Sequence, residues 1–370
     1  MPRYYLHSNV IFEPNALEKL PEELARLGIT KPLMVTDPGL AELGMVQKCS
    51  DLVPELVAFD STPPNPTELA ANQAAELYRR HACDGIFALG GGSSMDLAKA
   101  VGILVTHKCD LSDYDVTGPS PKSLGPIAPL LVIPTTAGTG TEVSVGCVLM
   151  FNDGHKGVID SERLIPATVI CDPKLTLSLP ARLTAATGMD ALSHCIEGYC
   201  SNISNPLTEP IALDGIRRIA AAIERAVNEP NNLDARSDMM MGALQGGIAM
   251  SMELGAAHAM SVPIGAILHG HHGAETAAVL GAAMRFNEGS VPEKMKDIRD
   301  ALGVPSDGCV ENWVDNLCHR IGLGTSLRAL GLDETDIDRI AEEAAHSVFN
   351  ATNPRQGTVD EYRAILTSKL

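Results

Sequence analysis

The pattern of the chain changes after Leu179-Pro180, and this change constrains the fold more than any other feature. Up to that point, short apolar runs alternate with helical patterns. The runs have the length and composition of buried strands and lie at residues 32–37, 55–60, 84–89, 130–134 and 168–172. Strands alternating with helices predict a doubly wound parallel sheet with helices on both faces.

Long helical patterns dominate after residue 180, and we expect no strand there. They cover residues 184–200, 206–227, 235–252, 293–302 and 334–349. A chain of 370 residues is too long for one compact core. The sequence therefore predicts an α/β domain at residues 1–180 and an all-helical domain at residues 181–370.

Composition excludes several classes of protein. The formal net charge of −18 disfavours binding to nucleic acid or to an anionic membrane. The nine cysteines are scattered without a Cys-x-x-Cys pair, so neither a disulfide framework nor a thiolate zinc site is expected. No apolar stretch has the length of a signal peptide or a membrane span, and we expect a cytoplasmic location.

A glycine-rich turn, GGGSSMD at residues 90–96, stands between an apolar run and a helical pattern. Glycines admit a ligand close to the backbone, and a helix N-terminus attracts an anion. Ser93 and Asp96 have the spacing of a capping box, so a plain, well-capped turn is the alternative. The place of the turn, at the carboxyl end of a strand in a doubly wound sheet, favours ligand binding.

Two further strand ends carry polar groups. Residues 134–142 (PTTAGTGTE) offer hydroxyls and exposed backbone to a polar ligand, or form a solvated loop. Asp37 ends the first strand of this pattern, where a carboxylate accepts hydrogen bonds from an adenosine ribose and repels a 2′-phosphate. An Asp before Pro-Gly is also a common turn former.

Asp190 and His194 are four residues apart in a helical pattern, which puts both side chains on one helix face. His258 lies in another helical pattern, and His272 follows it. One carboxylate and three imidazoles suit Fe(II) or Zn(II), although any single histidine could instead belong to the core. Glu197 could orient a ligand or form a surface ion pair.

Seven segments together resemble the iron-containing (group III) alcohol dehydrogenase family: VTDPGL, PPNPT, GGGSSMDLAKA, PTTAGTGTEVS, LPARLTAATGMDALSHCIEGY, GAAHAMSVPIGA and HHGAE. They run from about residue 33 to about residue 276, most of the chain. The resemblance implies the fold of dehydroquinate synthase, with a dinucleotide-binding domain, a helical metal-binding domain and an active site in the cleft between them.

The resemblance also implies site residues. It implies four metal ligands: Asp190, His194, His258 and His272. It implies contacts to NAD from the pyrophosphate turn, the adenosine side and the nicotinamide ribose, at Asp37, Asn65, Gly91, Gly92, Ser93, Asp96, Thr135, Thr136 and Lys156. Asp37 stands at the position associated with preference for NAD over NADP.

One departure concerns the proton path. Many family members carry a second histidine four residues after the third ligand, where this chain has Val262. His269 or His271 could replace it, and with His272 they are the candidate catalytic residues.

The resulting hypothesis is reversible hydride transfer between a small alcohol or aldehyde and NAD, in a homo-oligomer, with the metal as Lewis acid on the alcohol oxygen. Three alternatives stay open. One is glycerol dehydrogenase-like or synthase chemistry on the same fold, another is a metal-dependent hydrolase, and the third is a non-catalytic protein that binds metal or NAD.

Overall fold

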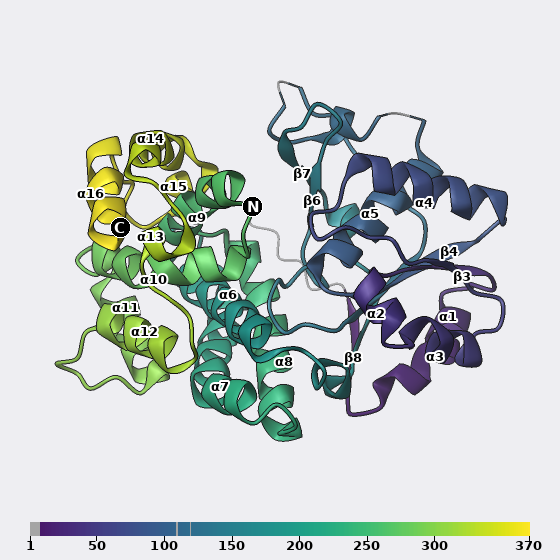
Figure 1. Cartoon of the computed structure of the whole chain (residues 1–370), viewed down its shortest axis with the longest axis horizontal. Coiled ribbons are helices and arrows are strands. Elements are labelled where there is room, and N and C mark those ends of the chain that lie inside the picture. The colour runs from purple at the N-terminus through teal and green to yellow at the C-terminus, as the bar shows by residue number, and fades with distance from the viewer. Residues whose placement is uncertain (1–7, 109, 119) are drawn as a thin grey trace. The chain divides into compact units, whose positions relative to one another are not determined.

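The computed structural model describes residues 8–108, 110–118 and 120–370, and these form two compact units. One unit runs to Thr136 and includes Thr141–Thr176, and the other consists of Leu177–Leu370 with Ala137–Gly140 (Figure 1). The short segment belongs to the helical unit because Gly138 and Gly140 lie directly against its backbone. A Cβ on Gly140 would be 2.4 Å from the Cα of Gly247.

A parallel sheet of six strands forms the first unit, in the order β1-β8-β5-β4-β2-β3. The strands are β1 (Asn9–Phe12), β2 (Pro32–Val35), β3 (Val57–Phe59), β4 (Gly85–Gly90), β5 (Leu130–Pro134) and β8 (Thr168–Cys171). All their pairings are parallel, which confirms the predicted sheet and its five expected strands. The sequence did not predict β1, an edge strand whose residues are exposed or half-buried.

Helices cover both faces of this sheet (Figure 1). The helices are α1 (Leu20–Arg26), α2 (Pro38–Glu42), α3 (Met45–Leu52), α4 (Glu68–Arg80) and α5 (Gly92–Thr106). On one face, Leu20 and Leu24 of α1 pack in a core cluster with Phe87 and Leu131 of the sheet. A separate antiparallel hairpin, β6 (Gly146–Met150) and β7 (Lys156–Asp160), was not expected.

The second unit contains helices and no strand in its described residues, as expected. Its helices are α6 (Ala181–Cys200), α7 (Glu209–Asn228), α8 (Leu233–Ala249), α9 (Ala256–Leu268), α10 (His272–Asn287), α11 (Pro292–Leu302), α12 (Val310–Arg320), α13 (Leu327–Leu330), α14 (Ile337–His346), α15 (Val348–Thr352) and α16 (Val359–Lys369). Helix α6 is buried almost throughout, because small residues let its neighbours approach. A Cβ on Gly198 would lie 2.6 Å from the carbonyl oxygen of Ala249.

The single helix expected at residues 334–349 is wrong. Helix α14 ends at His346, and Ser347 then adopts an extended conformation with ψ of 145°. Its hydroxyl accepts a hydrogen bond from the amide of Phe349 and caps a new helix, α15. Within the described part of the chain, no helix is both long and apolar enough to cross a membrane.

Candidate metal centre and cofactor turn

Helix α6 carries Asp190 and His194 one turn apart, both with 4% of their surface exposed. The first turn of α10 lies directly against this stretch of α6. A Cβ on Gly273 would be 2.2 Å from the carbonyl oxygen of Ala186 and 3.0 Å from the Cβ of Asp190. Glycine at 273 therefore lets its neighbour His272 approach the carboxylate of Asp190.

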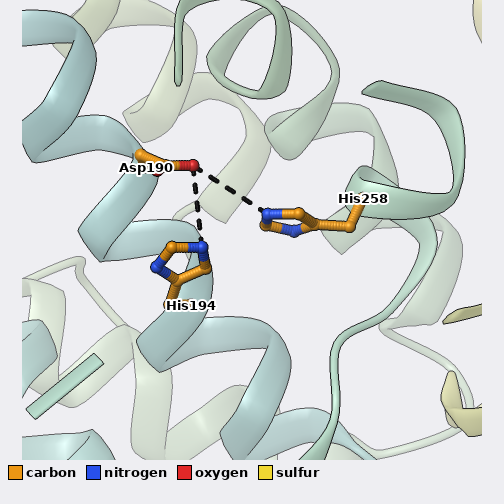
Figure 2. Close-up of side chains that lie close together, drawn as sticks. All are labelled: Asp190, His194 and His258. Atoms are coloured by element: carbon orange, nitrogen blue, oxygen red, sulfur yellow. Dashed lines mark ion pairs between the residues drawn. The ribbon is translucent and has the colours of Figure 1, made fainter. Parts of the chain in front are cut away.

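Three imidazoles surround one carboxylate oxygen. The Nε2 atoms of His194, His272 and His258 lie 3.7, 3.8 and 3.9 Å from Oδ1 of Asp190. Figure 2 shows Asp190, His194 and His258 directed toward one another from two helices. The structure therefore brings the four expected ligands together, from α6, α9 and α10.

The donor set fits a divalent metal ion. Among the described residues, Asp190 Oδ1 and His258 Nε2 are buried and have no hydrogen-bond partner. Such atoms are costly in a folded protein unless a ligand satisfies them. Bond lengths of about 2.1 Å in a tetrahedral zinc site place ligand atoms roughly 3.4 Å apart, which is close to the spacing found here.

Burial and charge set the protonation of the two histidines that are fully enclosed. Burial, followed by the neighbouring His258, lowers the pKa of His194 to about 3, so this imidazole is neutral at pH 7. Burial alone would lower the pKa of His258, but the carboxylate of Glu197 raises it above its usual value. A neutral imidazole is the form that binds a metal ion.

Glu197 contacts His258 at Nδ1, the ring nitrogen that does not face Asp190. It is 1% exposed, and its Oε2 is hydrogen-bonded to Nδ1 of His258. Its Oε1 accepts from the amide of Ala257 at 2.6 Å. The contact at Nδ1 leaves Nε2 directed at Asp190, so Glu197 orients a candidate ligand. Because Glu197 is buried, the alternative of a surface ion pair is wrong.

The other two histidines of the segment His269-Gly270-His271-His272 are exposed. His269 ends α9 in the left-handed region, with φ of 51°, and His271 precedes the first residue of α10. Val262 is 44% exposed on α9. Burial lowers the pKa of His271, and the charge of Asp190 opposes that shift. No interaction between His269 and the four candidate ligands is described, and the catalytic role of both histidines stays a prediction.

The glycine turn joins β4 to α5. The expected capping box of Ser93 and Asp96 is wrong, because α5 already begins at Gly92 with Gly91 as its N-cap. The hydroxyl of Ser93 instead donates to the carbonyl of Pro64, and Asp96 is buried. A helix start capped by glycine leaves its first amides to a ligand such as a phosphate.

Further candidate cofactor contacts gather at the carboxyl ends of β2, β4 and β5, which are neighbours in the sheet. Thr135 donates its amide to Gly90 at 3.0 Å, and a Cβ on Gly91 would lie 3.3 Å from Thr136. Asp37 caps α2 by accepting from the amide of Leu40 at 3.1 Å, which confirms that it forms the turn. Asn65 and Lys156 are exposed.

The sequence did not single out Lys99, which is fully buried in α5. Its ammonium donates to the carbonyls of Ser144, at 2.9 Å, and Gly146, at 2.7 Å. Burial raises the pKa of Asp96 to about 7, and the charge of Lys99 opposes that rise. The signal was a lysine three residues after Asp96, within a stretch from Leu97 to Val105 that is otherwise apolar.

Gly90→Ala is expected to weaken NAD binding about tenfold. The new methyl group would lie 2.5 Å from the Oγ of Ser94 and would displace the first turn of α5. Isothermal titration calorimetry of the purified protein with NAD measures the affinity. Gly289→Ala is the control, because a Cβ there meets nothing within 4 Å, and equal affinities in the two variants would contradict the assignment of the turn.

A doubly wound sheet with a glycine turn, combined with a helical Asp/His centre, defines a nucleotide-dependent metalloenzyme. Residues 7–173 match the family of iron-containing alcohol dehydrogenases, and residues 184–370 match the C-terminal domain of the same family. The chain belongs to the iron-containing alcohol dehydrogenase family. It is therefore an oxidoreductase of the alcohol dehydrogenase type, and NAD and iron are the cofactors of that family.

Similar proteins cover the whole chain. It is 39% identical to a 4-hydroxybutyrate dehydrogenase of Cupriavidus necator, over 99% of both chains. A solved 1,3-propanediol oxidoreductase has a TM-score of 0.95 at 37% identity and covers 99% of each chain. A sulfoacetaldehyde reductase from Bifidobacterium kashiwanohense, solved in complex with NAD+, has a TM-score of 0.93 at 28% identity, over 100% of this chain and 98% of the other.

Proposed function

We propose that the protein catalyses reversible hydride transfer between NAD and a short primary alcohol that carries a second polar group at its far end. The observation that supports this most is the arrangement of three imidazole Nε2 atoms within 3.9 Å of one buried carboxylate oxygen. Two of the similar proteins are named for 4-hydroxybutyrate and 1,3-propanediol, which both have a terminal hydroxyl and a polar far end.

In this proposal, Asp190, His194, His258 and His272 hold one divalent ion, Fe(II) or Zn(II). When bound, such an ion acts as a Lewis acid that polarises the alcohol oxygen and lowers the pKa of its hydroxyl group. Burial keeps His194 neutral, which is the form that binds a metal ion, and Asp190 would be the single carboxylate among the four ligands.

The remaining roles follow from the same proposal. Residues 1–180 would bind NAD and residues 181–370 the metal. The proposed contacts to NAD are Asp37, Asn65, Gly91, Gly92, Ser93, Asp96, Thr135, Thr136 and Lys156. Val262 cannot carry a proton, so His269 and His271 are the proposed carriers, because both are exposed and flank the loop that leads to His272.

The test is NADH formation by metal-stripped protein that has been reconstituted separately with Fe(II) and Zn(II). The panel contains 1,3-propanediol, 4-hydroxybutyrate and 1-propanol, so that the far end of the substrate varies. We expect turnover only after reconstitution, and faster turnover for the two substrates with a polar far end. Transient NADH without accumulation would favour synthase chemistry, and NAD binding without turnover on any alcohol would favour a non-catalytic protein.

A further inference from the structure

The helix that carries His258 begins without a capping side chain of its own. The N-cap of α9 is Gly255, so the first amides of the helix need acceptors from elsewhere. The amide of Ala257 donates to Glu197, as described above. The amide of Ala256 donates to Oδ1 of Asn353 at 3.1 Å, and Asn353 lies 97 residues further along the chain.

Asn353 is held rigidly where it meets α9. It is 1% exposed and forms a pair of amide hydrogen bonds with Asn287 of α10. Asn287 Nδ2 donates to Asn353 Oδ1 at 2.9 Å, and Asn353 Nδ2 donates to Asn287 Oδ1 at 2.7 Å. Asn353 Nδ2 also donates to the carbonyl of Arg355 at 2.6 Å, so both ends of this amide are occupied. Asn353 therefore links the start of α9 to Asn287, the last residue of α10, at the opposite end of that helix from His272.

Gly255 makes room for both acceptors. A Cβ at this position would lie 2.7 Å from Asn353 Oδ1 and 3.1 Å from Glu197 Oε1. Its φ of −143° does not require glycine. Glycine is needed at this position because a side chain would collide with the two acceptor oxygens. The start of α9, Asn353 and Glu197 thus form one close-packed junction beside the metal centre.

Phe349 and Thr352 of α15, which lie just before Asn353, make two more contacts with the same junction. The ring of Phe349 meets the ring of His258 edge to face, with centroids 6.0 Å apart and an interplanar angle of 67°. The hydroxyl of Thr352 donates to the carbonyl of Leu254 at 2.8 Å, just before α9. The position of His258 therefore depends on residues near the end of the chain.

We propose that Asn353 is a positioning residue of the metal centre: it fixes the first turn of α9 and thereby the direction of His258. This inference rests on the proposed function, because it assumes that His258 is a ligand. Removal of a residue that orients a metal ligand typically costs ten- to a hundredfold in metal affinity. The predicted defect is in metal retention, and it exceeds what a loss of general stability would cause.

The experiment measures Zn²⁺ affinity of the full-length protein by competition with a chromophoric chelator, together with its melting temperature. Asn353→Ala is expected to bind Zn²⁺ about tenfold more weakly than the unmodified protein. Asn350→Ala is the matched control from α15, the short helix that ends directly before Asn353. Asn350 is 6% exposed, and its hydrogen bonds run to Ala345, Gly357 and Tyr362. We expect this control to lose stability and to keep its Zn²⁺ affinity.

Gly255→Ala supplies a second variant in which all the hydrogen-bonding side chains are retained. Its methyl group should displace Asn353 and Glu197 together and weaken Zn²⁺ binding at least as much as Asn353→Ala. Unchanged affinity in both variants, or an equal loss in Asn350→Ala, would overturn the positioning role. Unmodified protein that binds no Zn²⁺ would instead overturn the proposed function, and the role of Asn353 with it.

Discussion

His258→Ala is expected to abolish stoichiometric metal binding and to lower kcat/KM by about 10³-fold, since a Lewis-acid metal contributes several kcal/mol to the transition state. His258 is 2% exposed, and its Nε2 lies 3.9 Å from Asp190 Oδ1. The substitution removes one of the four proposed ligand atoms and also leaves Glu197 as a buried carboxylate without its imidazole partner. Metal content per chain and NADH formation, measured on the same sample, report both effects.

His319→Ala is the control for that experiment, because His319 is an exposed histidine on α12. It should retain one metal ion per chain and full activity. Full turnover by metal-free His258→Ala would refute the metal centre as the site of chemistry. Metal bound at full stoichiometry by His258→Ala would refute His258 as a ligand.

Glu197→Gln has the second-largest expected effect, a ten- to hundredfold loss of metal affinity with a parallel fall in activity. Glu197 accepts two hydrogen bonds with two different oxygens, one from the amide of Ala257 and one at Nδ1 of His258. A glutamine has a single acceptor oxygen and an NH₂ group in place of the other. Either the amide of Ala257 or Nδ1 of His258 then faces the buried NH₂ group of the glutamine instead of an acceptor. We expect His258 to lose its orientation as a result.

Chelator competition with Zn²⁺ gives the affinity of Glu197→Gln, and Glu224→Gln serves as the control. Glu224 forms a surface ion pair with Arg320, and such pairs contribute little. A Glu197→Gln protein with the metal affinity of the control would show that His258 holds its direction without the carboxylate.

The sheet was predictable because its strands are short, uniformly apolar and buried on both faces, as in β4 and β5. The three missed strands lack that signal. β1 is an edge strand with exposed residues. In the hairpin, β6 alternates half-buried with buried positions and β7 alternates exposed or half-buried with buried ones, over only five residues each. Local pattern also misled at Ser93, where the spacing of a capping box was present but the helix begins earlier.

The site was predictable where its residues share a helix, as Asp190 and His194 do. The spacing of four residues fixed their common face without reference to the rest of the fold. The sequence alone could not choose among His269, His271 and His272, because a loop precedes α10 and its path depends on packing at Gly273. Contacts between residues far apart in the sequence also depend on packing and could not be predicted. The hydrogen bond between Asn353 and Ala256, 97 residues apart, is the clearest example.

Anomalous diffraction at the zinc edge, from crystals of the protein reconstituted with Zn²⁺, tests the proposed metal centre most directly. The proposed metal centre predicts one strong peak per chain, about 2.0–2.2 Å from a carboxylate oxygen of Asp190 and from the Nε2 atoms of His194, His258 and His272. A peak at any other set of residues, or none at this cluster in crystals of metal-loaded and active protein, would contradict it.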